Sequence, residues 1–475
     1  MNITWQITRE EWRLLLRDRV AVLALVSLLL LATIASLTAW EQRRMGHLER
    51  TQHQKQVDQA FQAQPDRHPH RMVHYGHFVF RPLNPMAAFD PGIDAYTGNT
   101  LFLEGHRQNS PNFGDVRQSS LLLRFGQPTP AFVLQVLAPL LLVFIGHGAL
   151  TRERESGTWR VLLAQGVRPR QIVAGKLLAL IGVAVVAFLP ALVALLWIAA
   201  TTTAPAILVT LMAAAYAGWL LVWCVGVLGV SACLASGCDT LLALLAVWVL
   251  SVVMLPRLAP EMAALAQPLP TRYETDIAVT RDLAALGNSH NPDDPYFTVF
   301  RKKVLNQYGV DRVEDLPVNY KGLVSMEGER LTSTLFEQYA TVNFERQTTQ
   351  LQYIDGLAWL SPVMALRRLS MAASGSDLHA YRRFVEQAER HRYRLVQSLN
   401  KLQAEKLSYA GDRSSRDSRI ERAHWHAVAN FQHEAAPPTE TVRRTLPAAT
   451  VLLFWLMGMA CLLVLATRRL GRITP

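Results

Sequence analysis

Histidine is the residue type whose spacing in this chain could support chemistry. His68, His70, His74 and His77 fall within ten residues. Neutral imidazoles spaced in this way can bind zinc or copper. No cysteine or acidic residue lies among them, and histidine-rich loops are often only polar, so a solvated loop is the alternative. The sequence by itself therefore assigns no metal, and these four histidines are its candidate ligands.

Motifs for catalysis are missing from the sequence. His424 and His426 flank Trp425, but no acidic residue completes a metalloprotease arrangement, and neither H-E-x-x-H nor G-x-S-x-G occurs. The phosphate-binding pattern G-x-x-x-x-G-K-S/T is also missing. We therefore expect no enzymatic activity and no cofactor in this chain itself. A membrane-bound hydrolase would have only scattered histidines to use.

Composition and charge narrow the class of protein. The chain has 475 residues and a formal net charge of +11, which would suit binding to nucleic acid. However, its apolar residues form long uninterrupted runs, and the nearest arginines flank those runs instead of forming one basic face. Nucleic acid is therefore not an expected partner. The cysteines lie in or beside apolar runs, so the polar segments are expected to fold without disulfides.

Six apolar runs are long enough to cross a bilayer, which requires about 20 helical residues. They predict an all-α membrane protein with six transmembrane helices. Two long polar segments, 41–129 and 257–445, separate some of these runs. The expected spans are residues 20–40, 130–150, 171–199, 205–233, 240–256 and 446–467.

The arginine clusters predict the orientation of these helices. One cluster precedes the first span, one lies between the second and third, and one follows the last. With six crossings all three fall on the same side, which the positive-inside rule makes cytoplasmic. We therefore expect a multi-pass protein of a bacterial cytoplasmic (inner) membrane, in contact with the lipid bilayer. Both termini, including the tail 468–475, would be cytoplasmic, and both polar segments would be extracytoplasmic domains.

The first 19 residues are predicted to form an interfacial helix on the cytoplasmic surface. Trp5, Trp12, Leu15 and Leu16 lie near one helical face, and arginines recur every fourth residue on another. The alternative is a helix that continues the first span inward.

The loop 151–170 between the second and third spans is predicted to contain a short helix. Ser156 or Thr158 can cap it, Gly166 can end it in the left-handed conformation, and Pro169 can begin the next span. An apolar face carrying Trp159 and a leucine pair would then be exposed and would require a partner. The alternative is a helix that packs under its own bundle.

The same loop resembles a known family. Glu155, Gly157 and Thr158 stand in the sequence E-S-G-T, which the leucine pair and G-V-x-P follow. This pattern is similar to the cytoplasmic loop of ABC-2-type (type V exporter-like) transporter permeases. Further similarity, in H-Y-G-H-F-V-F-R-P-L-N-P from His74 and W-L-S-P from Trp359, is to a bacterial subgroup with two large extracytoplasmic insertions.

The resemblance implies a function that depends on other subunits. Two copies of an ABC ATPase subunit would bind ATP and Mg²⁺, and a second permease subunit, identical or related, would complete the pathway for an unidentified substrate, most often exported. The alternative is a mechanotransmitting subunit that acts on an envelope partner through its outer domain. The residues implied to contact the ATPase are Glu153, Glu155, Gly157, Thr158, Trp159, Leu162 and Leu163.

The second polar segment is predicted to be mainly helical. Apolar residues recur at helical spacing over 328–354 and over 377–407, which favours two long helices packed as a hairpin. Residues 356–373 between them are apolar but contain Pro362. We expect this stretch to be an interfacial segment at the outer surface, with a buried connector as the alternative.

Overall fold

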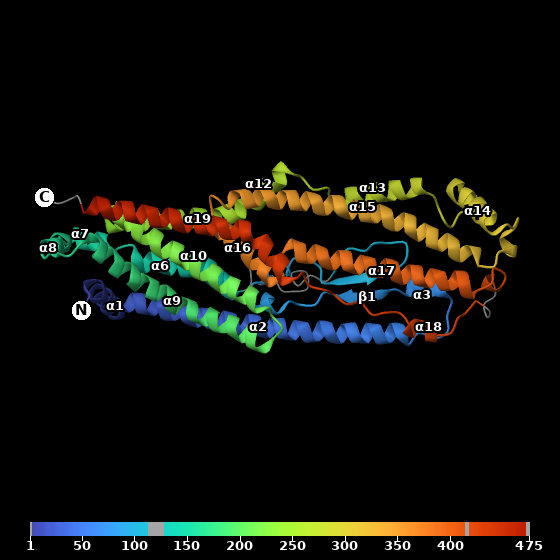
Figure 1. Cartoon of the computed structure of the whole chain (residues 1–475), viewed down its shortest axis with the longest axis horizontal. Coiled ribbons are helices and arrows are strands. Elements are labelled where there is room, and N and C mark those ends of the chain that lie inside the picture. The colour runs from blue at the N-terminus through green and yellow to red at the C-terminus, as the bar shows by residue number, and fades with distance from the viewer. Residues whose placement is uncertain (1, 113–127, 414–417, 472–475) are drawn as a thin grey trace.

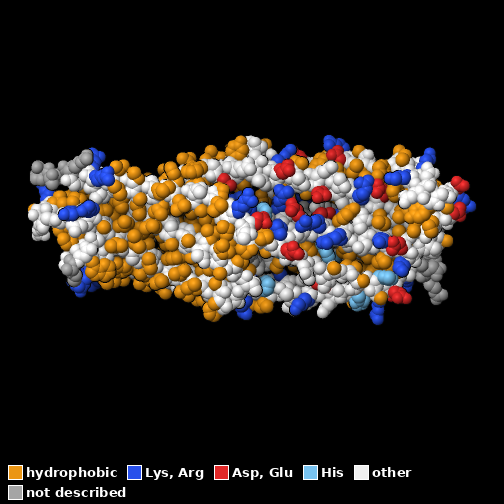
Figure 2. Space-filling view, in the orientation of Figure 1, with side chains coloured by type: hydrophobic (Ala, Val, Ile, Leu, Met, Phe, Trp, Pro, Cys, Tyr) orange, Lys and Arg blue, Asp and Glu red, His pale blue; other side chains and the backbone are white. Residues whose placement is uncertain are grey.

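The computed structural model describes residues 2–112, 128–413 and 418–471 of an elongated, mainly helical molecule (Figure 1). A helical bundle occupies one end and a polar domain, made of the described residues within 41–112 and 267–437, occupies the other. The helix α1 (Ile3–Arg17) and the last turn of α19 lie at the far end of the bundle, here called the termini end. Hydrophobic side chains cover the bundle, and charged side chains are concentrated on the polar domain (Figure 2).

The bundle contains six helices that are long and apolar enough to cross a membrane. Every predicted span lies within one of them to within one residue, which confirms six candidate spans. Their bounds are α2 (Arg19–Gln62); α5 (Pro130–Phe132) with η3 (Val133–Leu137), α6 (Ala138–Gly146) and α7 (Thr151–Glu155); α9 (Pro169–Thr201); α10 (Ala206–Cys233); α11 (Gly237–Trp248) with η4 (Val249–Met254) and α12 (Leu255–Ala266); and α19 (Pro438–Leu470).

The first two helices are separate because Asp18 stands between them. Its backbone is extended, with φ −77° and ψ 100°, and its carboxylate accepts hydrogen bonds from the N–H groups of Val20 and Ala21. These bonds satisfy free donors at the start of α2. The N-terminal residues therefore form a distinct helix rather than an extension of the first span, and Figure 1 shows α1 nearly end-on beside the lengthwise α2.

Glycines in α9 allow α1 to pack closely against it. A Cβ atom at Gly175 would lie 2.7 Å from the Cβ of Ile7, and one at Gly182 would lie 2.8 Å from the ring of Trp12. The hydroxyl of Thr8 donates to the carbonyl of Gly175 over 2.9 Å. Small residues thus let two helices approach at the termini end.

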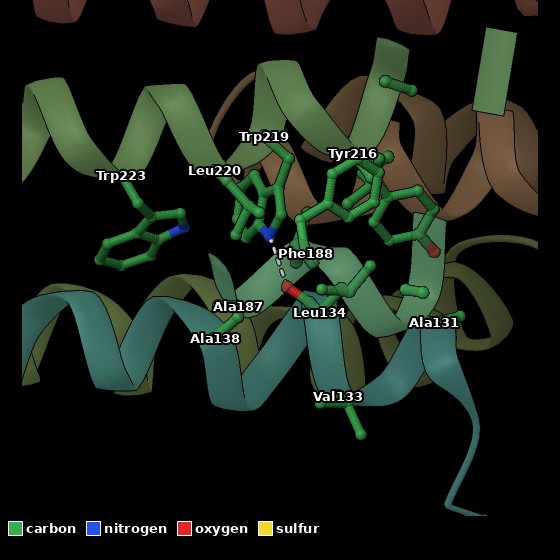
Figure 3. Packing of buried hydrophobic residues seen from close by; sticks show 14 of the residues in the cluster. Ala131, Val133, Leu134, Ala138, Ala187, Phe188, Tyr216, Trp219, Leu220 and Trp223 are labelled. Carbon is green, nitrogen blue, oxygen red and sulfur yellow. Dashed lines mark hydrogen bonds between the residues drawn. The ribbon is translucent and has the colours of Figure 1, made fainter. Parts of the chain in front are cut away.

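A π-helical turn in the second span determines part of the packing of the bundle. Such a turn changes the backbone hydrogen-bond pattern and leaves carbonyl groups free, which is costly in an apolar environment. The carbonyl of Leu134, in η3, accepts a hydrogen bond from the indole N–H of Trp219 over 3.1 Å (Figure 3). The carbonyl of Val136, in the same turn, accepts one from Trp248 over 3.0 Å. Two tryptophans therefore satisfy the turn while filling the core.

The polar domain is a helical assembly on which a two-stranded antiparallel sheet is packed. The strands pair from His77 opposite Leu103 to Phe80 opposite Thr100. The elements are α3 (Pro69–Tyr75), β1 (His77–Phe80), η1 (Pro85–Ala88), β2 (Thr100–Leu103), α13 (Arg272–Leu286), α14 (Pro295–Tyr308), η5 (Val313–Asp315), α15 (Tyr320–Leu357), α16 (Pro362–Ser374), α17 (Leu378–Lys406), η6 (Gly411–Arg413) and α18 (Ala423–His426).

The long helices α15 and α17 pack against each other, as the two apolar stripes predicted. Phe344 on α15 joins Phe384 and Ala388 on α17 in one apolar cluster, which also includes Val79 and Leu101 of the sheet. A second cluster joins the end of α2 to α3, α17 and α18 around the fully buried Trp425. The polar domain therefore has cores of its own, separate from that of the bundle.

The connector α16 lies between the bundle and the polar domain and is almost entirely buried. It packs against α10 and α19, which favours the buried connector over an exposed interfacial segment. Its Ser370 hydroxyl is 3.0 Å from that of Tyr216, which accepts a hydrogen bond from Gln135 over 2.8 Å. Ser370 also donates to Asp90, and Arg367 donates to Gln135 over 3.1 Å. This buried chain of polar groups fixes α16 to two spans.

Candidate functional site

The predicted loop between the second and third spans folds into α7 and a second short helix, α8 (Thr158–Ala164). Gly157 precedes α8 with φ +76°, and Gly166 follows it with φ +82°, conformations that glycine adopts without strain. The N–H groups of Gly166 and Val167 donate to the carbonyls of Leu163 and Leu162 over 2.9 and 3.1 Å. This is a Schellman motif, so the end of the predicted helix is confirmed.

Trp159 is not exposed, so the prediction of an exposed tryptophan is wrong. Its side chain is 5% exposed and packs in a cluster with Leu150, Ile172, Leu228 and Leu470. The helix α8 is amphipathic, and its apolar side packs within the same chain because residues of four spans lie beside it. The packing of Trp159 therefore anchors α8 to the end of the bundle.

An ionic cluster attaches the same loop to α1. The ammonium group of Lys176, on α9, is 2.5 Å from a carboxylate oxygen of Glu11 and 2.7 Å from one of Glu153. The Lys176 side chain is 2% exposed, whereas those of Glu11 and Glu153 are 16% and 14% exposed. Three segments are thereby joined by one buried cation. Glu153, predicted as a contact residue, is committed to this cluster.

The remaining predicted contact residues divide between internal and exposed positions. Glu155 is exposed, and its carboxylate accepts a hydrogen bond from the N–H of Gly237 over 2.8 Å, at the start of α11. Leu162 and Leu163 are half-buried against the Trp159 cluster. Gly157 and Thr158 are exposed, together with four α8 or adjacent residues that the sequence prediction did not include: Arg160, Val161, Ala164 and Gln165.

Two of the four predicted metal ligands are paired with carboxylates instead. The Nε2 atom of His68 lies 2.5 Å from Asp412, and that of His77 lies 2.9 Å from Asp58. His68 also begins α3, because its Nδ1 accepts a hydrogen bond from the backbone N–H of His70. The predicted set of four therefore does not assemble as one site.

The other two predicted ligands meet histidines from distant parts of the chain. On α3 the Nε2 atoms of His70 and His74 lie 3.1 Å apart. His106, in the turn after β2, and His290, between α13 and α14, lie beside them: one nitrogen from each of His70, His106 and His290 falls within 4.8 Å of the others. Burial lowers the pKa of His70 to about 4, with smaller contributions from neighbouring histidines, and burial also lowers the pKa of His106. Both rings are therefore neutral near pH 7.

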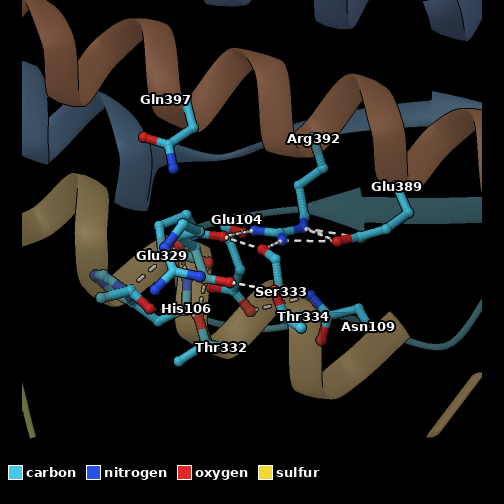
Figure 4. A network of polar contacts seen from close by, with 12 residues as sticks. Glu104, His106, Asn109, Glu329, Thr332, Ser333, Thr334, Glu389, Arg392 and Gln397 are labelled. Carbon is cyan, nitrogen blue, oxygen red and sulfur yellow. Dashed lines mark hydrogen bonds and ion pairs between the residues drawn. The ribbon is translucent and has the colours of Figure 1, made fainter. Parts of the chain in front are cut away.

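A buried ionic network supports this histidine group (Figure 4). Arg392, on α17, donates to Glu329 over 2.6 Å and to Glu389 over 2.7 Å, and it also reaches Ser333 and the carbonyl of Glu104. Arg392 and Glu329 are 1% and 0% exposed. The other oxygen of Glu329 accepts a hydrogen bond from the backbone N–H of His106 over 2.9 Å. The network thus fixes the turn that carries His106.

Sequence reasoning missed Glu11, Lys176, His106, His290 and Arg392 as members of these clusters. Lys176 had a local signal, because it is an ionisable residue several positions inside an apolar helix. Arg392 had only the ordinary helical spacing to Glu389, and Glu11, His106 and His290 had no local signal, since their partners lie far away in the sequence.

These features are those of a mainly helical membrane protein with six candidate membrane-spanning helices and a polar domain at one end of the bundle. Residues 272–434, from the start of α13 to just before α19, match a family described as a domain of unknown function (DUF3526). No curated protein sequence matches the chain.

Proposed function

We propose that this chain is the membrane subunit of an ABC-type transporter, driven by a separate ATPase. The observation that supports this best is the geometry of α8. Trp159 and the Lys176 cluster hold the helix on the end of the bundle, while Arg160, Val161 and Ala164 are exposed. A helix that is rigidly anchored and has one exposed face can transmit force from a partner that binds this face.

The orientation is part of the same proposal. The termini end is cytoplasmic, because the arginine clusters before the first span, between the second and third, and after the last all lie there. The membrane is the bacterial inner membrane, and the polar domain lies outside it. In this arrangement α1 rests at the cytoplasmic surface with Trp5 and Leu16, which are 60% and 65% exposed, available to lipid.

The ATPase subunits bind ATP and Mg²⁺ and are expected in two copies, with a second permease subunit beside this one. The resemblance of the E-S-G-T loop to ABC-2 permeases supports this composition, with export as the direction. Glu155, Gly157 and Thr158 are retained as contact residues. Trp159 and Glu153 act indirectly, by holding the loop in place.

The test is to purify the tagged chain in a mild detergent from the bacterium that naturally produces it. Mg²⁺-dependent ATP hydrolysis and the subunits that co-purify are then measured. Val161→Asp should reduce co-purified ATPase at least tenfold, because it places a charge on the contact face. Val299→Asp is the matched control, since Val299 is 68% exposed on the polar domain. Equal ATPase recovery from both variants would exclude the proposed contact.

A mechanical role is the second candidate, and the continuity of α2 favours it. This helix has 44 residues, so it is about 66 Å long and reaches from the termini end far into the polar domain. Together with the buried α16 it links the two regions rigidly. If the ATPase drives a mechanical relay, Gln42→Pro, which breaks α2 after the span, should abolish nucleotide-dependent changes of hydrogen exchange in α15 and α17. Persistence of these changes would exclude a relay through α2.

A further inference from the structure

Three histidines from separate segments converge in the polar domain. His70 comes from α3, His106 from the turn that follows β2, and His290 from the loop between α13 and α14. One nitrogen of each ring lies within 4.8 Å of the other two. We propose that His70, His106 and His290 bind one divalent transition-metal ion of borderline softness, with Zn²⁺ as the ion that fits best.

Unpaired ring nitrogens are the first argument for this site. The Nδ1 atom of His70 and the Nε2 atom of His106 are buried and have no hydrogen-bond partner. Buried polar atoms are nearly always paired, since leaving one without a partner costs about 1–3 kcal/mol. A metal ion accommodates such lone pairs directly.

The surroundings of His106 are the second argument. Its Nδ1 atom lies 3.5 Å from a carboxylate oxygen of Glu329, on the opposite side of the ring from the unpaired Nε2. Histidines that bind metals usually direct their second nitrogen at a carboxylate or carbonyl, which orients the ring and increases its basicity. Glu329 is fixed in turn by Arg392 and Ser333.

The backbone of His106 is the third argument. Its φ of +62° is the left-handed conformation, which no other described non-glycine residue adopts. Strained backbone of this kind is concentrated at functional sites. Here the strain is maintained by the hydrogen bond from the His106 N–H to Glu329 and by the close packing of Gly105 against Val73, where an added Cβ would lie 2.3 Å from a side-chain carbon.

The donor set selects the class of metal. Imidazole nitrogens favour zinc, copper and nickel over magnesium or calcium, which prefer oxygen ligands. In a tetrahedral zinc site with Zn–N distances near 2.0–2.1 Å, neighbouring nitrogens lie about 3.4 Å apart. His290 is on an exposed loop, so its ring can move inward toward the nitrogens of His70 and His106.

Metal binding would connect the two polar segments of the sequence. His70 and His106 belong to the first, and His290 belongs to the second, inside the matched family region. Ser289 already packs against Gly328 of α15, beside Glu329, so the loop is seated next to the site. The ion would hold this loop against α3 and the His106 turn. The site is independent of the ATPase contact, which lies at the other end of the molecule.

The experiment uses the full-length chain in detergent, carrying an affinity tag without histidine. The protein is stripped with EDTA, loaded with Zn²⁺, dialysed and measured for bound metal. We expect one Zn²⁺ per chain, and the absorption bands of tetrahedral Co²⁺ when cobalt replaces zinc. His290→Ala should weaken binding at least tenfold, because it removes one ligand.

The control is His426→Ala, which removes another exposed histidine of the polar domain and should leave binding unchanged. His106→Asn should also lose binding, and unchanged circular dichroism of the exposed His290 variant guards against unfolding as the cause. Absence of bound Zn²⁺ in the wild-type protein, or equal binding by the His290 and His426 variants, would overturn the proposal.

Discussion

Lys176 at the termini end and Arg392 in the polar domain are both buried cations that join distant segments through two carboxylates, but they differ in how they do so. The ammonium of Lys176 makes two ionic contacts, to Glu11 and Glu153, whose side chains reach solvent. The guanidinium of Arg392 uses its planar fork to bind Glu329, Glu389, a serine and a backbone carbonyl.

This difference determines how freely each ionic cluster can rearrange. A lysine is a flexible point charge, so one carboxylate can leave while the other remains. An arginine fork with four partners permits one arrangement only. The lysine lies where a moving ATPase is proposed to act, and the arginine lies behind the His106 turn, which a metal site requires to be fixed. Four substitutions or changes of condition test whether the two regions respond independently.

Arg392→Met should have the largest effect, about 3–5 kcal/mol of lost stability in the polar domain, because Glu329, which is 0% exposed, would stay buried without a cation. Hydrogen exchange should become faster in α15 and α17 and stay unchanged in α9 and α10. Arg390→Met, at an exposed position of α17, is the matched control. Equal acceleration in the bundle would mean that the two regions unfold together.

Trp159→Ala should destabilise the termini end by about 3 kcal/mol, because it leaves a large cavity among residues of four spans. Exchange in α7 and α8 should increase, while the polar domain is unaffected. Trp5→Ala removes an exposed tryptophan from α1 and should have little effect. A stable, normally folded α8 in the Trp159 variant would contradict the proposal that this residue anchors the helix to the bundle.

Lys176→Met should cost less, about 1–2 kcal/mol, because Glu11 and Glu153 can turn toward water once the cation is removed. Hydrogen exchange should become faster in α1 and α7 together, since the Lys176 cluster joins these two helices. Arg170→Met, an exposed change near the start of α9, serves as the control. If only one of the two helices responds, Lys176 does not link them.

Acidification should weaken the polar domain through His391, by about 1.4 kcal/mol per pH unit at most. Burial lowers the pKa of His391 to about 4, from 6.5 in the unfolded chain. The unfolded state therefore binds more protons in this window, so stability present above pH 6.5 is lost as the pH falls toward 4. Proteolysis of the polar domain in urea at pH 7.0 and 5.5 measures the loss, and His391→Phe should reduce it. An unchanged pH dependence in that variant would assign the effect elsewhere.

Local physical rules account for the part of the structure that could be predicted. Each of the six spans was visible as an apolar run, because a helix must satisfy its own backbone in a membrane and bury apolar side chains along its full length. The turn at Gly166 and the start of α9 at Pro169 were predictable because both depend on the conformations allowed to a single residue. The stripes of α15 and α17 followed from helical periodicity.

The assembly of the sites depended on residues that are distant in the sequence. His68 and His77 looked equivalent to His70 and His74, yet Asp412 and Asp58 bind the first two, and His106 and His290 join the others. No spacing rule indicates such partners, because they are brought together by the packing of α3, the sheet and α15.

The amino-acid sequence alone determined that this is a mainly helical membrane protein, and it determined the six candidate spans, the ends of the loop helix and the long helical pair, because hydropathy, periodicity and capping act over a few neighbouring residues. Only the tertiary structure decided that Trp159 is buried, that α16 lies between the bundle and the polar domain, and which histidines converge. Those outcomes depend on which surfaces meet when distant segments pack, and an amphipathic face does not specify its own partner.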